Sequence, residues 1–105
     1  MKKVIHIQRT DRKISVIARH YGLWPQLKKC CEELFELHVA IIILRVINFI
    51  GGTKPKHYEH VYEELSDIRI MLDQIEFLTR SEACCRDIRE SKLERQLTLI
   101  ETEAK

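Results

Sequence analysis

Turn-forming residues are scarce in this chain, which has only three glycines and two prolines among 105 residues. An all-β fold needs frequent turns, so this shortage disfavours one. A strong charge of one sign is also lacking: 18 basic and 16 acidic side chains leave a formal charge of +2, too little to indicate nucleic-acid binding. At this length we expect a single domain with a modest core, for which oligomerisation is a source of further burial.

Long apolar runs are missing as well. The most apolar run, residues 39–50, is short and is interrupted by Arg45 and Asn48, which makes it unsuited to spanning a bilayer. The charged start Met1-Lys2-Lys3 is followed by polar residues and no apolar core, so it does not resemble an export signal. We therefore expect a cytoplasmic protein that does not associate with membranes.

The four cysteines form two vicinal pairs, Cys30-Cys31 and Cys84-Cys85, and neither pair is a C-x-x-C motif. Neighbouring residues on a helix point about 100° apart, so one pair rarely offers both sulfurs to one zinc ion. We expect reduced, partly buried thiols. Zinc held jointly by the two pairs, and disulfides, remain alternatives.

Helical spacing dominates the pattern from residue 12 onward. Apolar periodicity and breakers predict four helices, over residues 12–21, 25–48, 55–79 and 82–99. Gly22 and Gly51-Gly52 separate the first three, and Pro25 and Pro55 suit first helical positions. Residues 1–12 are ambiguous between a short strand and a loose arm, within a single domain of residues 1–105.

The second predicted helix carries a seam that is polar at its start and apolar at its end. It comprises Gln26, Lys29, Glu33, Glu36, Ala40, Ile43 and Ile47. Residues 39–44 are apolar nearly all round, which predicts burial on more than one side, either at a subunit interface or as a central helix. The third helix carries an apolar stripe, bordered by Glu64, Asp67 and Met71, made of Val61, Leu65, Ile68, Leu72 and Ile75.

One acidic phrase occurs twice, 31 residues apart: Glu32-Glu33-Leu34-Phe35-Glu36 and Glu63-Glu64-Leu65-Ser66-Asp67. On a helix, residues three apart lie about 60° apart and near one another, so each phrase can aim two carboxylates at one point. Two facing helices of this kind can build an all-oxygen site for a hard divalent cation. A straight hairpin would leave the two pairs roughly 8 Å out of step, so tilt or a returning loop is required.

A divalent cation in this all-oxygen site would support phosphate chemistry. Mg²⁺ keeps several waters and is often completed by substrate phosphates, and basic residues crowd both ends of the chain. Glu32 or Glu36 is then placed to orient or deprotonate a water. Iron is disfavoured because no Glu-x-x-His phrase is present. The competing interpretation is an exposed acidic face, with Lys29 and Glu33 as an ordinary surface ion pair.

These residues resemble a known family. Glu32-Glu33-x-x-Glu36 followed by Glu64-x-x-Asp67 is similar to the signature of the MazG-like all-α nucleoside triphosphate pyrophosphohydrolases, especially short, phage-type members. Further similarity lies in His20 to Lys29, Met71 to Ile75 and Lys92-x-x-Arg95, so the resemblance covers roughly residues 13–97.

The resemblance implies a four-helix bundle assembled as a homodimer or as a dimer of dimers. It implies Mg²⁺, with Mn²⁺ as a substitute, held by Glu33, Glu36, Glu64 and Asp67. It also implies hydrolysis of a (deoxy)nucleoside triphosphate to a monophosphate and pyrophosphate, with phosphates gripped by Lys92 and Arg95 and helped by Gln26 and Lys29. The alternative is a non-catalytic helical interaction or nucleotide-binding module on the same scaffold.

Overall fold

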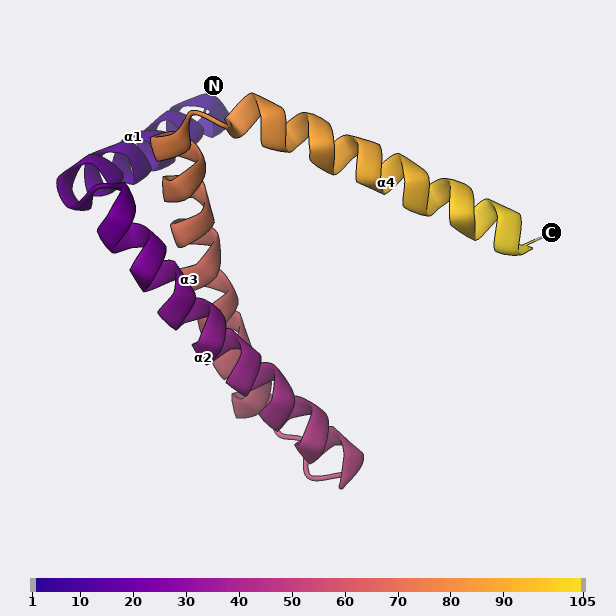
Figure 1. Cartoon of the computed structure of the whole chain (residues 1–105). Helices are drawn as coiled ribbons and strands as arrows, with labels where there is room; N and C mark the ends of the chain where they lie inside the picture. The colour runs from indigo at the N-terminus through magenta and orange to yellow at the C-terminus, as the bar shows by residue number, and fades with distance from the viewer. Residues whose placement is uncertain (1, 105) are drawn as a thin grey trace.

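The computed structural model describes the backbone of residues 2–104 and the side chains of residues 11–104. Four helices follow one another over this range: α1 (Lys2–Tyr21), α2 (Leu23–Phe49), α3 (Pro55–Thr79) and α4 (Glu82–Ala104). The described residues contain no strand. The all-α class is therefore confirmed (Figure 1).

The helix boundaries follow the breakers in the sequence. Gly22, with a φ of 84°, takes the left-handed backbone that turns α1 into α2, and Pro55 is the first residue of α3. The structure differs from the prediction at the N-terminus, where α1 begins at Lys2 instead of following a strand or arm. No glycine or proline occurs between residues 2 and 21, so nothing in that stretch interrupts the helix.

The helices contact one another unequally. α2 and α3 run antiparallel along most of their length, and α1 lies across the end of that hairpin where α2 begins and α3 ends (Figure 1). Ala18 of α1 is fully buried there, and the Arg19 guanidinium lies 5.2 Å from the centre of the Phe77 ring. Among the residues that the structure describes, α4 contacts α3 alone, and it extends away from the other helices. The described chain is thus a three-helix unit with a projecting fourth helix.

The buried seam of α2 has a different phase from the predicted one. The residues of α2 that are buried or half-buried along it are Gln26, Cys30, Glu33, Leu37, Ala40, Leu44 and Ile47. Lys29, Glu36 and Ile43, which were predicted to lie on this face, are exposed. The observed 4-3 alternation from Gln26 is more stable than the predicted 3-4 alternation. It buries Cys30, Leu37 and Leu44, and it leaves the charged Lys29 and Glu36 in water.

The facing seam of α3 is rotated in a similar way. Its buried residues are Val61, Glu64, Ile68, Met71 and Gln74, whereas Leu65 and Leu72 are 39% and 46% exposed. Ile68 and Met71 pack with Cys30, and Leu37 and Ile75 pack against this small cluster. Glu64 therefore lies within the seam instead of on its border.

The loop between α2 and α3 folds back along α2. The Gly52 amide donates to the Ile47 carbonyl oxygen at 3.1 Å, and the Thr53 hydroxyl donates to the Asn48 side-chain oxygen. Gly51 has a φ of 78°, which allows the chain to reverse. Because the loop returns, α3 starts beside the last turns of α2, and the two acidic phrases come closer to level than a straight hairpin would set them.

Among the described residues, no helix has both the length and the apolar character that crossing a bilayer requires.

Candidate metal centre

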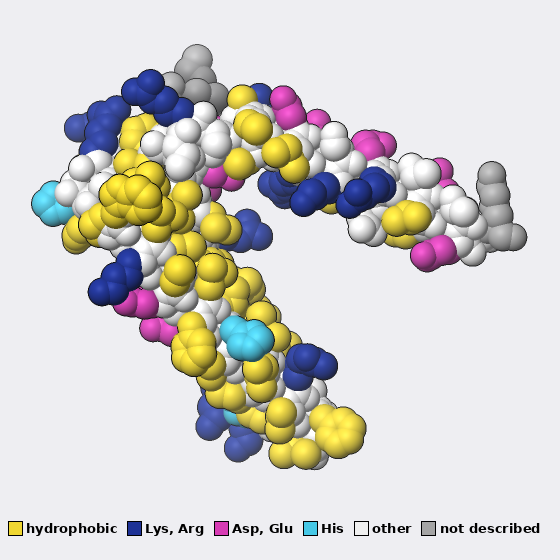
Figure 2. All heavy atoms as spheres, in the orientation of Figure 1, with side chains coloured by type: hydrophobic (Ala, Val, Ile, Leu, Met, Phe, Trp, Pro, Cys, Tyr) yellow, Lys and Arg dark blue, Asp and Glu magenta, His cyan; other side chains and the backbone are white. Residues whose placement is uncertain are grey.

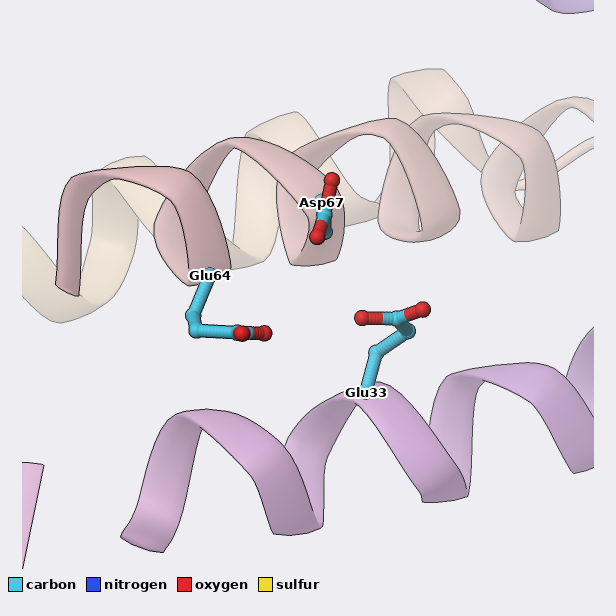
Figure 3. A group of neighbouring side chains, drawn as sticks. All are labelled: Glu33, Glu64 and Asp67. Carbon is cyan, nitrogen blue, oxygen red and sulfur yellow. The ribbon is translucent and has the colours of Figure 1, made fainter. Parts of the chain in front are cut away.

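Three carboxylates converge between α2 and α3. Glu33 comes from α2, Glu64 and Asp67 come from α3, and each offers an oxygen that lies within 4.8 Å of the others (Figure 3). Glu64 and Asp67 are one turn apart on α3, so both can face the same point on α2. Figure 3 shows the carboxylates of Glu33 and Glu64 directed into the space between the two helices.

Burial sets this group apart from an ordinary acidic surface. Glu33 is 8% exposed and Glu64 is 9% exposed, whereas Asp67 is open to solvent. Glu33 Oε2 and Glu64 Oε2 are both buried and have no hydrogen-bond partner. Taking a carboxylate out of water without a partner is expensive, and two such groups side by side also repel each other. The arrangement therefore lacks a compensating positive charge.

One cation of the chain lies nearby but does not supply that compensation. The Lys29 ammonium lies 3.6 Å from Glu33 Oε1, one helical turn before it, and its side chain is 55% exposed. The pair is half open to water, since the Glu33 side chain is 10% exposed, and i, i+4 ion pairs on helices contribute about 0.3–0.5 kcal/mol. Lys29 faces Oε1 of Glu33, which leaves the two buried Oε2 atoms unpaired.

An all-oxygen group suits a hard divalent cation. Mg²⁺ and Mn²⁺ prefer carboxylate and water ligands, and one exposed member keeps a path for water or a ligand open. Glu33, Glu64 and Asp67 are the residues that would hold such an ion. The two unpaired buried oxygens are the observation that fits it, since a cation would satisfy both at once.

Two other predicted acidic residues lie outside this group. Glu36 is exposed and is not among the three carboxylates that converge, because the phase of α2 directs Leu37 inward instead. Glu32 is also exposed. Glu36 is one turn from Glu33 on α2 and can approach a ligand bound there from the solvent side, whereas Glu32, directly before Glu33, lies about 100° away around the helix.

Gln26 takes a place in the interior. It is 6% exposed, and its Nε2 donates to Gln74 Oε1 at 2.5 Å. Gln74 is 2% exposed and its amide also lies 3.8 Å from the Met71 sulfur. Gln26 was predicted to help bind phosphates, but in the structure its side-chain amide is buried and already bonded to Gln74. Gln74 was not predicted as a partner, although its seven-residue spacing from Asp67 places it on the same side of α3.

Lys92 and Arg95 lie on α4, which does not contact α2 in the described part of the chain. Both side chains are exposed. Within one chain the structure does not bring these two predicted phosphate ligands to the carboxylates of Glu33, Glu64 and Asp67.

The thiols are free in the structure. All four cysteines are unbonded, with Cys30 buried and Cys31 and Cys84 exposed. Burial, together with the neighbouring Cys31 and the Glu33 carboxylate, raises the pKa of the Cys30 thiol above its ordinary value of 9.0. Among the described residues, the group that could hold a metal contains carboxylates and no sulfur.

A separate hollow of about 590 Å³ lies between α1 and α3. Arg12 and Arg19 line it together with Asp73 and Glu76. Its charges are of both signs, so it does not favour a ligand of one charge, and it stands apart from the converging carboxylates.

Comparison of the chain with models of protein families, with curated proteins and with solved structures finds no match.

Proposed function

We propose that this chain is a Mg²⁺-dependent nucleotide pyrophosphohydrolase that cleaves a (deoxy)nucleoside triphosphate to a monophosphate and pyrophosphate. The observation that carries the proposal is the pair of buried, unpaired oxygens of Glu33 and Glu64 beside Asp67. The doubled acidic phrase and its resemblance to MazG-like pyrophosphohydrolases supply the choice of substrate class.

The roles of the residues follow from their positions. Glu33, Glu64 and Asp67 hold the cation, and when bound it offsets charge on the phosphate oxygens of the substrate. Glu32 and Glu36, exposed on the solvent side of Glu33, orient a water and accept its proton. The water oxygen bonds to the α-phosphorus, the bond from that phosphorus to the bridging oxygen breaks, and pyrophosphate leaves.

The test compares two adjacent glutamates, the buried Glu64 and the exposed Glu63. In the wild type, Mg²⁺ at 100 times its Kd should stabilise the fold by about 2.7 kcal/mol, a rise in Tm of roughly 10–20 °C for a domain of this size. Glu64→Gln should abolish this response and the release of pyrophosphate. Glu63→Gln, one residue away and exposed, should retain both.

The measurements are thermal unfolding against Mg²⁺ and pyrophosphate release over a panel of common and damaged nucleoside triphosphates with Mg²⁺ or Mn²⁺. A wild type that releases no pyrophosphate from any of them contradicts the enzymatic proposal. A wild type whose Tm ignores Mg²⁺ contradicts the metal centre itself.

The second candidate is a non-catalytic helical module that binds a cation or nucleotide without turnover. The separation of α4 from the carboxylates favours it, since one chain alone does not bring Lys92 and Arg95 to the site. A Mg²⁺-dependent rise in Tm without pyrophosphate release from any nucleotide would select this module over the enzyme.

A further inference from the structure

α4 buries none of its 23 residues. Its apolar side chains stay open to solvent, and Ile88, Leu93 and Leu97 are each about half exposed. In proteins, helices gain most of their stability from packing an apolar face against other elements, and within one chain α4 has almost no such packing. The exposed face of α4 therefore calls for a partner surface.

The two sides of α4 differ in chemistry. Arg89 and Lys92 line one shallow groove together with Ile88 and Leu93, so basic and apolar residues share a side. In Figure 2, Lys and Arg side chains gather along the lower edge of α4, and most Asp and Glu side chains lie along its upper edge. The partner surface should accordingly be apolar and bordered by acidic residues.

α2 carries a surface of that description on the side opposite α3. A second stripe with 4-3-4-3 spacing, named here the outer stripe, lies about 160° around the helix from the buried seam. Its members are Phe35, Val39, Ile42, Val46 and Phe49, all exposed, with Phe49 91% exposed. The exposed carboxylates of Glu32 and Glu36 border one side of it.

The open surface of the whole chain matches what an assembled protein would cover. The chain exposes 9144 Å², while a compact 12.5 kDa monomer exposes about 6,200 Å². Its radius of gyration is 17.5 Å, against about 13 Å for a compact chain of this length. The excess of about 3,000 Å² per chain is enough for an obligate dimer, whose interfaces exceed about 2,000 Å² in total.

We propose that two copies of this chain exchange α4, so that α4 of each copy packs on the outer stripe of α2 in the other. Apolar residues of α4 then cover the outer stripe, and Arg89, Lys92 and Arg95 approach the border that carries Glu32 and Glu36. A twofold axis makes the exchange reciprocal, so both open faces are covered and the assembly closes at two chains.

The same chain cannot make this contact with itself. α4 is joined to α3 by Arg80 and Ser81 alone, and two residues span at most about 7 Å. The outer stripe lies on the far side of α2 from α3, beyond a helix separation of 8–10 Å. The exchange also brings Arg89, Lys92 and Arg95 of one copy to the Glu32 and Glu36 border of α2 in the other copy, within one helical turn of Glu33 along α2, which no contact within the described part of one chain achieves.

The first test measures molar mass in solution for the full chain by light scattering and analytical ultracentrifugation. The wild type should be a dimer, and both Ile42→Asp on the outer stripe and Leu93→Asp on α4 should weaken the dimer by at least 100-fold in Kd. Thr98→Asp, on the acidic side of α4, is the matched control and should leave the dimer intact.

Each outcome decides the matter. A monomeric wild type at micromolar concentrations overturns the proposal. Dissociation by Ile42→Asp alone indicates that α2 meets α2, and dissociation by Leu93→Asp alone indicates that α4 meets α4; either result overturns the exchange.

A second set of variants guards against loss of folding, because it changes only exposed charges. Glu32→Lys with Glu36→Lys should weaken the dimer about 10-fold at low salt, and Lys92→Glu with Arg95→Glu should do the same. All four changes in one chain should restore the dimer to within about threefold of the wild type. Failure of the combined variant to regain affinity contradicts the pairing. These readouts are masses and not activities, so they stand apart from the proposed catalytic function.

Discussion

The α2–α3 pair and α4 are both long helices rich in leucine, isoleucine and charge, yet only the pair has a core. In α2 and α3 one apolar face of each helix packs against the other helix, and Cys30, Ile68 and Met71 meet there at about 5% exposure. In α4 the apolar residues spread over about half of the circumference and none is buried. The comparison shows that helical spacing is enough to form a helix, whereas a concentrated face is needed to pack it within one chain.

The largest expected contrast is between two isoleucines, one in each region. Ile68→Ala in α3 should destabilise the fold by about 2–5 kcal/mol, because it leaves a cavity in the buried seam. Ile88→Ala in α4, half exposed, should cost less than about 0.5 kcal/mol in the dissociated chain. Urea unfolding at low protein concentration checks both values.

The dependence on protein concentration gives a further test of this contrast between Ile68 and Ile88. If α4 is covered in a dimer, the cost of Ile88→Ala should grow as protein concentration rises, while the cost of Ile68→Ala should stay constant. Equal costs for the two variants at every concentration would contradict the division of the molecule into a packed pair and an open helix.

A smaller contrast concerns two glutamines. Gln74→Ala should cost about 1–3 kcal/mol because it leaves the buried amide of Gln26 without its partner. Gln96→Ala on α4 is the control, since Gln96 is exposed and makes no such bond; it should change stability by less than about 0.5 kcal/mol. A Gln74→Ala variant as stable as the control would show that the pair does not organise the interior.

In the three converging carboxylates we expect a substitution that raises stability instead of lowering it. In the absence of divalent cations, Glu64→Gln should stabilise the fold by about 1–2 kcal/mol, because it removes a buried charge that lies beside the Glu33 carboxylate and whose Oε2 atom has no hydrogen-bond partner. Glu94→Gln on α4, fully in water, should leave stability unchanged. Thermal unfolding in excess chelator is the measurement. A metal-free Glu64→Gln protein that melts below the wild type would mean that the carboxylate is compensated in some other way.

The smallest effect concerns the Cys30 thiol, whose pKa is raised by burial, by Cys31 and by Glu33. Below pH 9.0 the thiol is protonated in the folded and unfolded states, so its contribution to stability is fully present. As the pH rises through 9.0 and towards the folded pKa, the unfolded chain loses the proton first, and the free energy of unfolding falls.

Two measurements follow for the thiol. Cys30→Ala should remove this part of the alkaline decline in stability. In the wild type, Cys84 should react with a thiol reagent well before Cys30, because Cys84 is exposed. Equal labelling rates for the two would contradict the burial of Cys30.

The sequence predicted the helices of the packed pair nearly to the residue, because Gly22, Gly51 and Pro55 are strong local signals. It misjudged which face is buried. The predicted seam passed through Lys29 and Glu36, whereas the structure buries Cys30 and Leu37, and both alternations fit a 3.6-residue repeat. Counting the apolar side chains on each alternative face would have favoured the observed one.

The wrong choice of buried face on α2 also explains which residues of the candidate site were predicted correctly. Glu33, Glu64 and Asp67 were predicted to meet and do meet, because both alternations share Glu33 and because the loop folds back along α2. Glu36 was predicted to join them and lies outside, since it belongs only to the alternation that the fold did not adopt. The placement of α4 could not be read from spacing, because its sparse apolar residues define no single face within one chain.

Arg80 joins the two regions and sets the direction of everything after it. Its backbone is left-handed, with a φ of 54°, a conformation that residues other than glycine seldom adopt. α4 is about 34 Å long at 1.5 Å per residue, so a small rotation of the backbone at Arg80 displaces its far end by a large distance. A rotation of roughly 10° there would carry the far end of the helix by about 6 Å, which is more than one helical turn. A rotation of the Arg80 backbone would therefore move the four basic side chains of α4, which are Arg86, Arg89, Lys92 and Arg95.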